Sequence, residues 1–299
     1  MENTPRNVIL QVGSLIALYL SASFLLTLVF GLINISYPSA ADSYWEIESA
    51  TESIRLGIAM LIVFFPTYII LTRLMNRFRR TEHGALYQNI TKWLIYLSLL
   101  ISGLVLLGTL VMAIYTFLNG DLTTRFLLKA AAVVGVIGAA FHYYILDARG
   151  VWMREEGKSV MYGVGATLVV FLAIAYGVTN IETPAVVREM KLDETQVNDL
   201  RNVQYQIDSY MAMSSSSLPD TLEAAYKTAG VDVPAAPEGR EGYTYEKTDG
   251  GFKLCATFSR DSVQNEFVDT SYIDPAAKIK NPENWNYKEG RYCFERIVK

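Results

Sequence analysis

The sequence predicts an all-α transmembrane helical bundle of five spans, followed by a small α+β domain outside the cytoplasm. Three observations predict this fold class. Residues 1–179 contain five long apolar segments, residues 192–299 are polar with strand-like alternation, and both cysteines lie in that polar part. Residues 180–191 are expected to form a linker. Charged residues make up 19% of the chain, below the roughly 25% of a typical soluble protein.

Each apolar segment is long enough to be a membrane-spanning helix. About 20 apolar residues cross the hydrocarbon core, and backbone groups there must be hydrogen-bonded within the segment. The first segment exceeds the roughly 7–15 apolar residues of a signal peptide, so we expect it to be retained as an anchor. The bilayer is therefore the first partner that the sequence predicts. The expected spans are residues 8–33, 54–74, 93–118, 126–146 and 160–178.

The distribution of basic residues predicts the orientation in the membrane. Cations are concentrated in two alternate loops, whereas the opposite loops are acidic. These cations are Arg73, Arg77, Arg79, Arg80, Lys92, Arg149, Arg154 and Lys158. By the positive-inside rule the N-terminus is cytoplasmic, and five spans place the C-terminal domain outside a bacterial inner membrane. The net charge of −4 and the lack of a long basic stretch with interleaved aromatic residues argue against a nucleic-acid partner.

Four ionisable residues within or beside the spans are candidates for a function in the bundle: Arg55, Asp121, Lys129 and His142. An ionisable group inside a membrane is a functional hypothesis by default. The alternative is structural, with Arg55 and Lys129 extending to the headgroups and His142 belonging to an aromatic belt.

Two further patterns concern the packing of the spans. Pro66 interrupts the second span and predicts a kink. Ala131, Gly135 and Ala139 recur every four residues in the fourth span, which predicts close approach of a neighbouring helix.

The polar part begins with a predicted amphipathic helix. Asp193 is expected to be its N-cap, with Gln196 completing a capping box. A second short helix follows Pro219, with Asp220 and Glu223 as another capping pair and Gly230 as its end. The face expected to be buried on the first helix consists of Val197, Leu200, Val203, Ile207 and Tyr210.

Alternating residues after the helices predict strands. Residues 243–246 and 252–258 are expected to form a hairpin, and residues 291–297 a final strand. Cys255 and Cys293 lie on these strands, and two cysteines in an oxidising compartment are expected to pair. No Cys-x-x-Cys motif or nearby histidine supports a redox or metal role.

The rest of the polar part offers little chemistry. Four acidic residues, Asp261, Glu266, Asp269 and Asp274, are either a solvated loop or oxygen ligands for Ca²⁺. No nucleophile elbow, phosphate-binding loop or histidine pair is present. We therefore expect no enzymatic activity, no catalytic residue and no cofactor.

The last 105 or so residues resemble the globular region of type IV pilins and type II secretion pseudopilins. The resemblance rests on Asp199-Leu200, Val203, Ile207-Asp208, Tyr210, Leu218-Pro219, Thr221-Leu222, Leu254-Cys255-Ala256 and Tyr292-Cys293-Phe294. It implies a domain for protein contact or assembly. Pilins have one processed N-terminal span with an internal glutamate. Here the preceding span, residues 160–178, has neither a processing site nor an acidic residue.

Residues 54–149 resemble a bacterial membrane-domain family of four predicted helices with no assigned function. The resemblance rests on Arg55, Pro66, the Asn119-Gly120-Asp121 turn and the segment from Tyr143 to Asp147. It implies a bacterial envelope protein and no particular activity.

The sequence thus favours a polytopic membrane protein that presents residues 192–299 to a protein partner in the cell envelope. The alternative is a small transporter or proton-linked channel that uses His142, Asp121 and Lys129.

Overall fold

The computed structural model describes residues 4–38, 44–81, 85–120, 123–213, 217–262, 279–280 and 284–298. The chain divides into two compact units, Met1–Ile181 and Glu182–Lys299. The first unit is helical and contains five helices that are long and apolar enough to cross a membrane. The second combines helices with a small antiparallel sheet. The predicted fold class is therefore confirmed.

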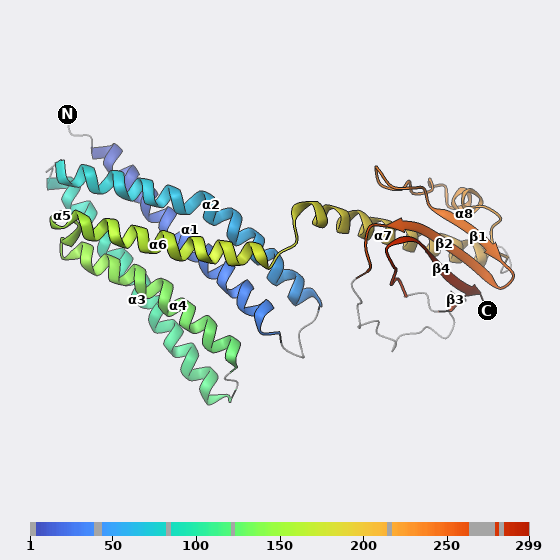
Figure 1. Ribbon diagram of the computed structural model, residues 1–299, viewed down its shortest axis with the longest axis horizontal. Helices are drawn as coiled ribbons and strands as arrows, with labels where there is room; N and C mark the ends of the chain where they lie inside the picture. The colour runs from blue at the N-terminus through green and yellow to red at the C-terminus, as the bar shows by residue number, and fades with distance from the viewer. Residues whose placement is uncertain are drawn as a thin grey trace. The chain divides into compact units, whose positions relative to one another are not determined.

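The first unit is a bundle of long helices joined by short connections (Figure 1). The helices are α1 (Thr4–Ser36), α2 (Tyr44–Thr81), α3 (Ala85–Leu118), α4 (Thr124–Ala148), the short α5 (Val151–Arg154) and α6 (Glu156–Thr179). Most of these helices are longer than their apolar segments, because the backbone hydrogen bonds of the helix continue into the polar residues on either side. Pro66 lies inside α2, which is helical from Tyr44 to Thr81.

Helix α1 is central, because it contacts α2, α3, α4 and α6. Its closest partner is α2, and two glycines permit the approach. A Cβ atom on Gly57 would lie 2.8 Å from Leu28 Cβ, and one on Gly31 would lie 2.8 Å from the carbonyl oxygen of Ala50. Small residues at such contacts let helix backbones pack closely in a membrane. The apolar core beside them consists of Leu25, Leu28, Leu32, Ile54, Ile58, Leu61, Phe65 and Val170.

The small residues expected to mediate close packing in α4 do not do so among the described residues. Gly135 has no described atom within 4 Å of the position of a Cβ, and Ala131 and Ala139 are exposed. The expectation was wrong because spacing identifies a smooth helix face but not the neighbour that covers it. Gly177 of α6 makes such a contact instead, with Leu28 and Ile58.

Aromatic side chains form the corner where α4 turns through α5 into α6. Gly150 adopts a left-handed conformation with φ of 72° and ends the α4 turn. Trp152 is fully buried, stacks on Tyr143 with ring centroids 4.9 Å apart, and donates from Nε1 to the Tyr143 carbonyl. Tyr162 of α6 contacts Trp152 edge-on at 5.2 Å. The corner is therefore held by aromatic packing.

The second unit begins with helix α7 (Pro184–Met213), which starts earlier than the sequence suggests. Residues 184–191, expected in a linker, are helical. Thr183 precedes Pro184, and its hydroxyl accepts a hydrogen bond from the Val186 N–H at 3.5 Å. Proline is favoured at the first helical position, because its missing N–H has no partner there.

Asp193 is therefore not an N-cap, and the capping box with Gln196 is wrong. Both residues lie inside α7 and are fully buried. The sequence did not show whether Asp193 caps the helix or lies inside it, because an acidic residue before an apolar stripe resembles an N-cap. The predicted stripe itself is confirmed. Val197, Leu200, Val203 and Ile207 are buried, Tyr210 packs beside them, and Met211 extends the stripe.

Helix α8 (Leu222–Ala229) is capped by Thr221 rather than by Asp220. The Thr221 hydroxyl accepts from the Ala224 N–H at 3.3 Å. Asp220 is one residue too early for this geometry and pairs with Lys247 instead. Gly230 ends the helix in a left-handed conformation with φ of 70°, as expected.

The sheet has the strand order β1-β2-β4-β3, and every pair is antiparallel. The strands are β1 (Thr244–Thr248), β2 (Gly251–Phe258), β3 (Ile279–Lys280) and β4 (Gly290–Val298). The predicted hairpin and final strand are present. Phe252, Leu254, Ala256 and Phe258 of β2 join the α7 stripe in one apolar core. Cys255 and Cys293 lie directly opposite each other on β2 and β4 and form the expected disulfide.

Candidate functional site

A buried ion pair lies at the end of the bundle that holds the aromatic corner. Arg79 Nη1 of α2 donates to both carboxylate oxygens of Asp147 of α4, at 2.8 and 3.1 Å. The side chains are 11% and 3% exposed. A charged group in this environment is expensive unless it is paired. The pair therefore connects the ends of α2 and α4.

Other polar side chains surround this ion pair. The hydroxyls of Ser14 and Thr72 are 2.8 Å apart and join α1 to α2. We call the whole set the bundle polar cluster. It comprises Gln11, Ser14, Thr72, Asn76, Arg79, Ser98, Tyr144 and Asp147. It draws residues from α1, α2, α3 and α4, so it is a shared feature of the bundle.

The cluster borders a small cavity. Its volume is about 20 Å³, and its lining combines polar groups with apolar side chains. The lining residues are Gln11, Ser14, Leu15, Met75, Leu94, Ile95, Ser98, Tyr144 and Asp147. A water molecule needs roughly 10–15 Å³ and two to four polar partners. The cavity therefore has room for about one water molecule.

The residues singled out from the sequence do not line this cavity. His142 is exposed on α4 and stacks on Tyr162 at 6.0 Å. Lys129 is half-buried, with its ammonium 5.8 Å from the centre of the Phe30 ring. Arg55 is half-buried on α2. Asp121 lies outside the described residues. The structure thus brings together neither His142 and Lys129 nor Arg55 with either of them.

The Arg79–Asp147 pair was missed, although the sequence contained a signal for it. Both residues lie near the ends of predicted spans on the same side of the membrane. Thr72, Asn76 and Arg79 recur at spacings of four and three, which places three polar groups on one helix face. A polar face at the end of an apolar span indicates an interior partner.

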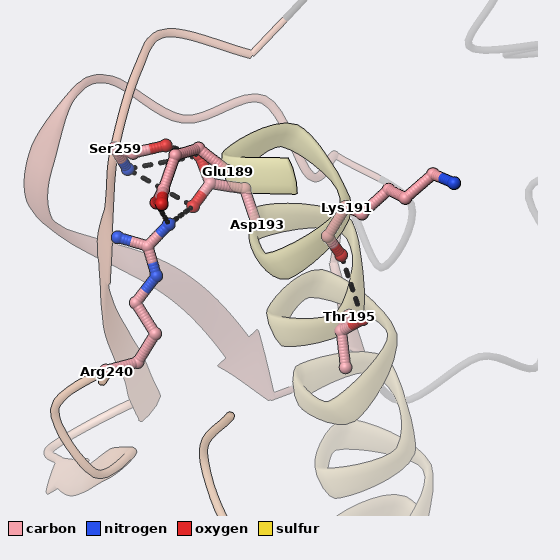
Figure 2. A network of polar contacts seen from close by, with 6 residues as sticks. All are labelled: Glu189, Lys191, Asp193, Thr195, Arg240 and Ser259. Atoms are coloured by element: carbon pink, nitrogen blue, oxygen red, sulfur yellow. Dashed lines mark hydrogen bonds and ion pairs between the residues drawn. The ribbon is translucent and has the colours of Figure 1, made fainter. Parts of the chain in front are cut away.

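The second unit contains its own buried ionic network, shown in Figure 2. Asp193 has no exposed surface and accepts from Arg240 Nη2 at 2.8 Å. It also accepts from the Ser259 hydroxyl at 2.7 Å and from the Ser259 N–H at 3.1 Å. Glu189, one turn earlier, accepts from the same arginine at 2.7 Å. The network fixes the start of α7 to the segments before β1 and after β2.

A second buried arginine holds β4 against α7. Arg296 is 4% exposed, and its Nε donates to Gln204 Oε1 at 2.6 Å. Its Nη2 donates to the Asn284 carbonyl at 2.8 Å, and its guanidinium lies 4.6 Å from the Trp285 ring centre. Loss of hydration lowers the Arg296 pKa to about 10. Nothing in the sequence indicated that Arg296 is buried, because arginine is usually exposed on a strand with alternating polar and apolar residues.

The acidic residues considered for Ca²⁺ are only partly described. Asp261 accepts from Lys288 Nζ at 2.7 Å and from the Glu289 N–H at 2.8 Å. These hydrogen bonds, that from Lys288 first, hold the Asp261 pKa below its usual value. Glu266, Asp269 and Asp274 lie outside the described residues. Within the part of the chain that the structure describes, no group of three metal-ligating side chains occurs.

The solvent-facing side of α7 exposes an aromatic residue. Tyr205 is 68% exposed, although Val203 and Ile207 on the opposite side have no exposed surface. Arg201, one turn earlier, lies 5.9 Å from the Trp285 ring centre. We call this surface the outer face of α7. It comprises Asn198, Arg201, Asn202 and Tyr205, which are all exposed.

Together these features define a polytopic membrane protein with an attached α+β domain. In comparisons with known proteins, residues 7–144 match a family model described as a domain of unknown function (DUF5671). The match includes most of α1 to α4, and so begins well before residue 54, where the sequence suggested such a family. No pilin or pseudopilin family model matches the chain. No curated protein and no solved structure matches it either.

Proposed function

We propose that this protein is a membrane-anchored binding protein of the bacterial cell envelope and not an enzyme. The five long helices form the anchor, and residues 192–299 contact a protein partner outside the cytoplasm. The observation that carries the proposal is the outer face of α7, where Tyr205 is 68% exposed on a helix whose other side is the domain core.

The composition of this face suits a protein interface. Tyrosine and arginine are enriched among residues that dominate binding energy, because each buries a large area and retains a polar group. Arg201 and Tyr205 are four residues apart and therefore neighbours on the helix surface. Asn198 accepts a hydrogen bond from Arg201 at 3.5 Å. The face thus offers an aromatic anchor beside a positioned cation.

The domain also holds this face in a defined position. Asp193, Arg240 and Ser259 fix the first half of α7, and the apolar core fixes its second half. Pre-organised surfaces lose less conformational entropy on binding. This rigidity supports a role in recognition.

Photo-crosslinking in native membranes tests the proposal. A photoreactive phenylalanine analogue replaces Tyr205 in the full chain, and a matched variant carries it at exposed Lys227 of α8. We expect a protein adduct of defined mass from position 205 and none from position 227. Adding Arg201→Ala to the first variant should weaken the adduct. Equal adducts at both positions, or none at any residue of the outer face, would contradict the proposal.

The proposed orientation has its own test. Protease added to intact spheroplasts should cleave a C-terminal epitope tag, and an N-terminal tag should resist until the membrane is opened. The reverse pattern would place the binding domain in the cytoplasm.

A proton-linked channel is the second candidate function, favoured by the bundle polar cluster and its water-sized cavity. Liposomes loaded with a pH-sensitive dye would report proton flux through the reconstituted chain. We expect the Asp147→Asn substitution to reduce any proton flux and the His142→Gln substitution to leave it unchanged. The reason is that Asp147 lines the cavity and His142 does not. Flux equal to that of empty liposomes would dismiss this candidate.

A further inference from the structure

We propose that Arg73 of α2 binds the phosphate group of a membrane phospholipid, in a notch that Gly163 leaves open on α6. The chemistry recognised is a phosphate oxyanion, and the source is a lipid headgroup. This inference concerns the first unit alone and does not depend on the proposed binding function.

The notch follows from the contact between α2 and α6. Arg73 is half-buried, and its Nη2 lies 3.3 Å from the position that a Cβ atom on Gly163 would occupy. Any side chain at position 163 would crowd the guanidinium. Gly163 therefore makes room for the Arg73 head against α6.

Arg73 has no acidic partner among the described residues, unlike the neighbouring Arg79. Arg79 lies six residues later, or about 9 Å along the helix axis, and is paired with Asp147 at 2.8 Å. An arginine at a membrane depth without an anion is costly. The Arg79 guanidinium is therefore neutralised within the bundle, whereas the Arg73 guanidinium can pair with the anion of a ligand.

The spacing of two arginines places Arg73 near the level of lipid phosphates. Arg55 and Arg73 are separated by 18 residues on α2, a rise of about 27 Å, close to the ~30 Å hydrocarbon thickness. Eighteen residues also make five whole turns, so both lie on one helix face. Arg73 can therefore extend its guanidinium to a headgroup over a short distance.

Two further polar residues lie one turn from the notch, toward the same end of the bundle. Ser159 precedes Gly163 by four residues on α6, and Asn76 follows Arg73 by three on α2. They are 8% and 4% exposed. Asn76 also belongs to the bundle polar cluster, so the guanidinium of Arg73 is the group that we assign to the phosphate. Guanidinium binds phosphate through two parallel hydrogen bonds.

Lipid retention by the full-length chain tests the proposal. Native mass spectrometry of the detergent-purified protein, titrated with phosphatidylglycerol, gives the affinity of the tightest bound lipid. We expect Arg73→Gln to weaken this binding about tenfold, the loss of one bidentate charged contact. Arg73→Lys should give an intermediate loss, because it keeps the charge but not the planar fork. Arg149→Gln, which removes an exposed arginine near the same end of the bundle, should have no effect.

A second variant keeps the arginine and fills the notch. Gly163→Leu should weaken lipid binding as strongly as Arg73→Gln, with an unfolding temperature in lipid-free detergent close to that of the unaltered chain. If Arg73→Gln fails to fold, the comparison of Gly163→Leu with Arg149→Gln decides the question alone.

Three outcomes would overturn the proposal. The first is equal lipid binding by the unaltered chain and by both notch variants. The second is an equal loss in Arg149→Gln, which would indicate a diffuse charge effect. The third is displacement of the lipid by millimolar inorganic phosphate that binds at the same residues, which would assign the site to free phosphate.

Discussion

The two units bury similar ion pairs and surround them differently. In the bundle, Asp147 is bonded to Arg79, with side chains 3% and 11% exposed. In the second unit, Asp193 is bonded to Arg240, with side chains 0% and 13% exposed. Asp193 also accepts hydrogen bonds from the hydroxyl and the N–H of Ser259, and Arg240 reaches the half-exposed Glu189.

This difference teaches how each environment compensates a buried charge. In the second unit, main-chain and side-chain donors share the Asp193 charge, and the partner Glu189 is half-exposed. In the bundle, among the described residues, Asp147 accepts hydrogen bonds from Arg79 alone, beside a cavity with room for one water. If one residue of the Arg79–Asp147 pair is removed, the other has fewer alternative partners than in the Asp193–Arg240 pair. Breaking the bundle pair should therefore cost more free energy of unfolding.

The largest expected effect is the loss of the bundle pair. Asp147→Ala leaves Arg79 buried without an anion and should destabilise the bundle by about 5 kcal/mol, the upper end for breaking a buried pair. Thermal unfolding of the full chain in detergent measures it. The double variant Arg79→Met/Asp147→Leu should recover most of this loss, because it removes both charges. A double variant as unstable as Asp147→Ala would contradict the explanation.

The disulfide should give the next largest effect, confined to the second unit. Replacing Cys255 and Cys293 by alanine frees a loop with a sequence separation of 38, worth about 4 kcal/mol in the chain-entropy model. Hydrogen exchange should increase in β2 and β4 and stay unchanged in the bundle helices. An equal increase in both units would show that their stabilities are coupled.

The Asp193–Arg240 ion pair of the second unit should be less costly to break than the Arg79–Asp147 pair of the bundle. Asp193→Ala should cost about 3 kcal/mol, because Glu189 still pairs with Arg240. Hydrogen exchange at the start of α7 measures the loss. Glu189→Gln is the matched control and should cost under about 1 kcal/mol, since that side chain is half-exposed. A larger loss for Asp193→Ala than for Asp147→Ala would reverse the comparison.

Alkaline pH should weaken the second unit through the buried Tyr226 and the partly buried Tyr245. Burial, and then the Asp199 and Asp220 charges respectively, raise the pKa of Tyr226 and Tyr245 from 10.0 to about 12. Each folded-state pKa exceeds the unfolded one, so the stabilisation is complete below pH 10 and is lost as the pH rises toward 12. Near-UV circular dichroism of the full chain should report this loss. Tyr226→Phe and Tyr245→Phe should reduce the pH dependence.

The smallest expected effect is at an exposed ion pair of the second unit. Lys247 and Asp220 are 2.8 Å apart, with side chains 47% and 90% exposed. Water and salt screen such a pair. Lys247→Ala should therefore leave the unfolding midpoint within experimental error. A measurable loss would mean that the Lys247 hydrogen bond to the Leu218 carbonyl contributes.

The sequence predicted features that depend on local periodicity. The five apolar helices, the α7 stripe, the Gly230 helix end and the Cys255–Cys293 pairing were all found in the structure. Each depends on nearby residues or, for the cysteines, on there being a single possible pair. The start of α7 was missed, because Pro184 fits a linker as well as a first helical turn.

The buried polar partners were beyond the reach of sequence patterns. Asp193 resembles a helix cap until Arg240 and Ser259, far along the chain, are seen around it. Arg79 is an ordinary loop cation until it is seen beside Asp147. His142 attracted attention as an ionisable residue in a span, yet it stacks on Tyr162 at the exposed side of the corner.

The sequence by itself determined the five apolar helices, the buried stripe of α7 and the three longer strands, because hydropathy and side-chain periodicity are local properties of the chain. Only the tertiary structure decided which charges are paired and which arginine lacks an acidic partner among the described residues. Those outcomes depend on contacts between residues distant in sequence. Burial makes such contacts energetically decisive, since a charge removed from water must find its partner within the fold.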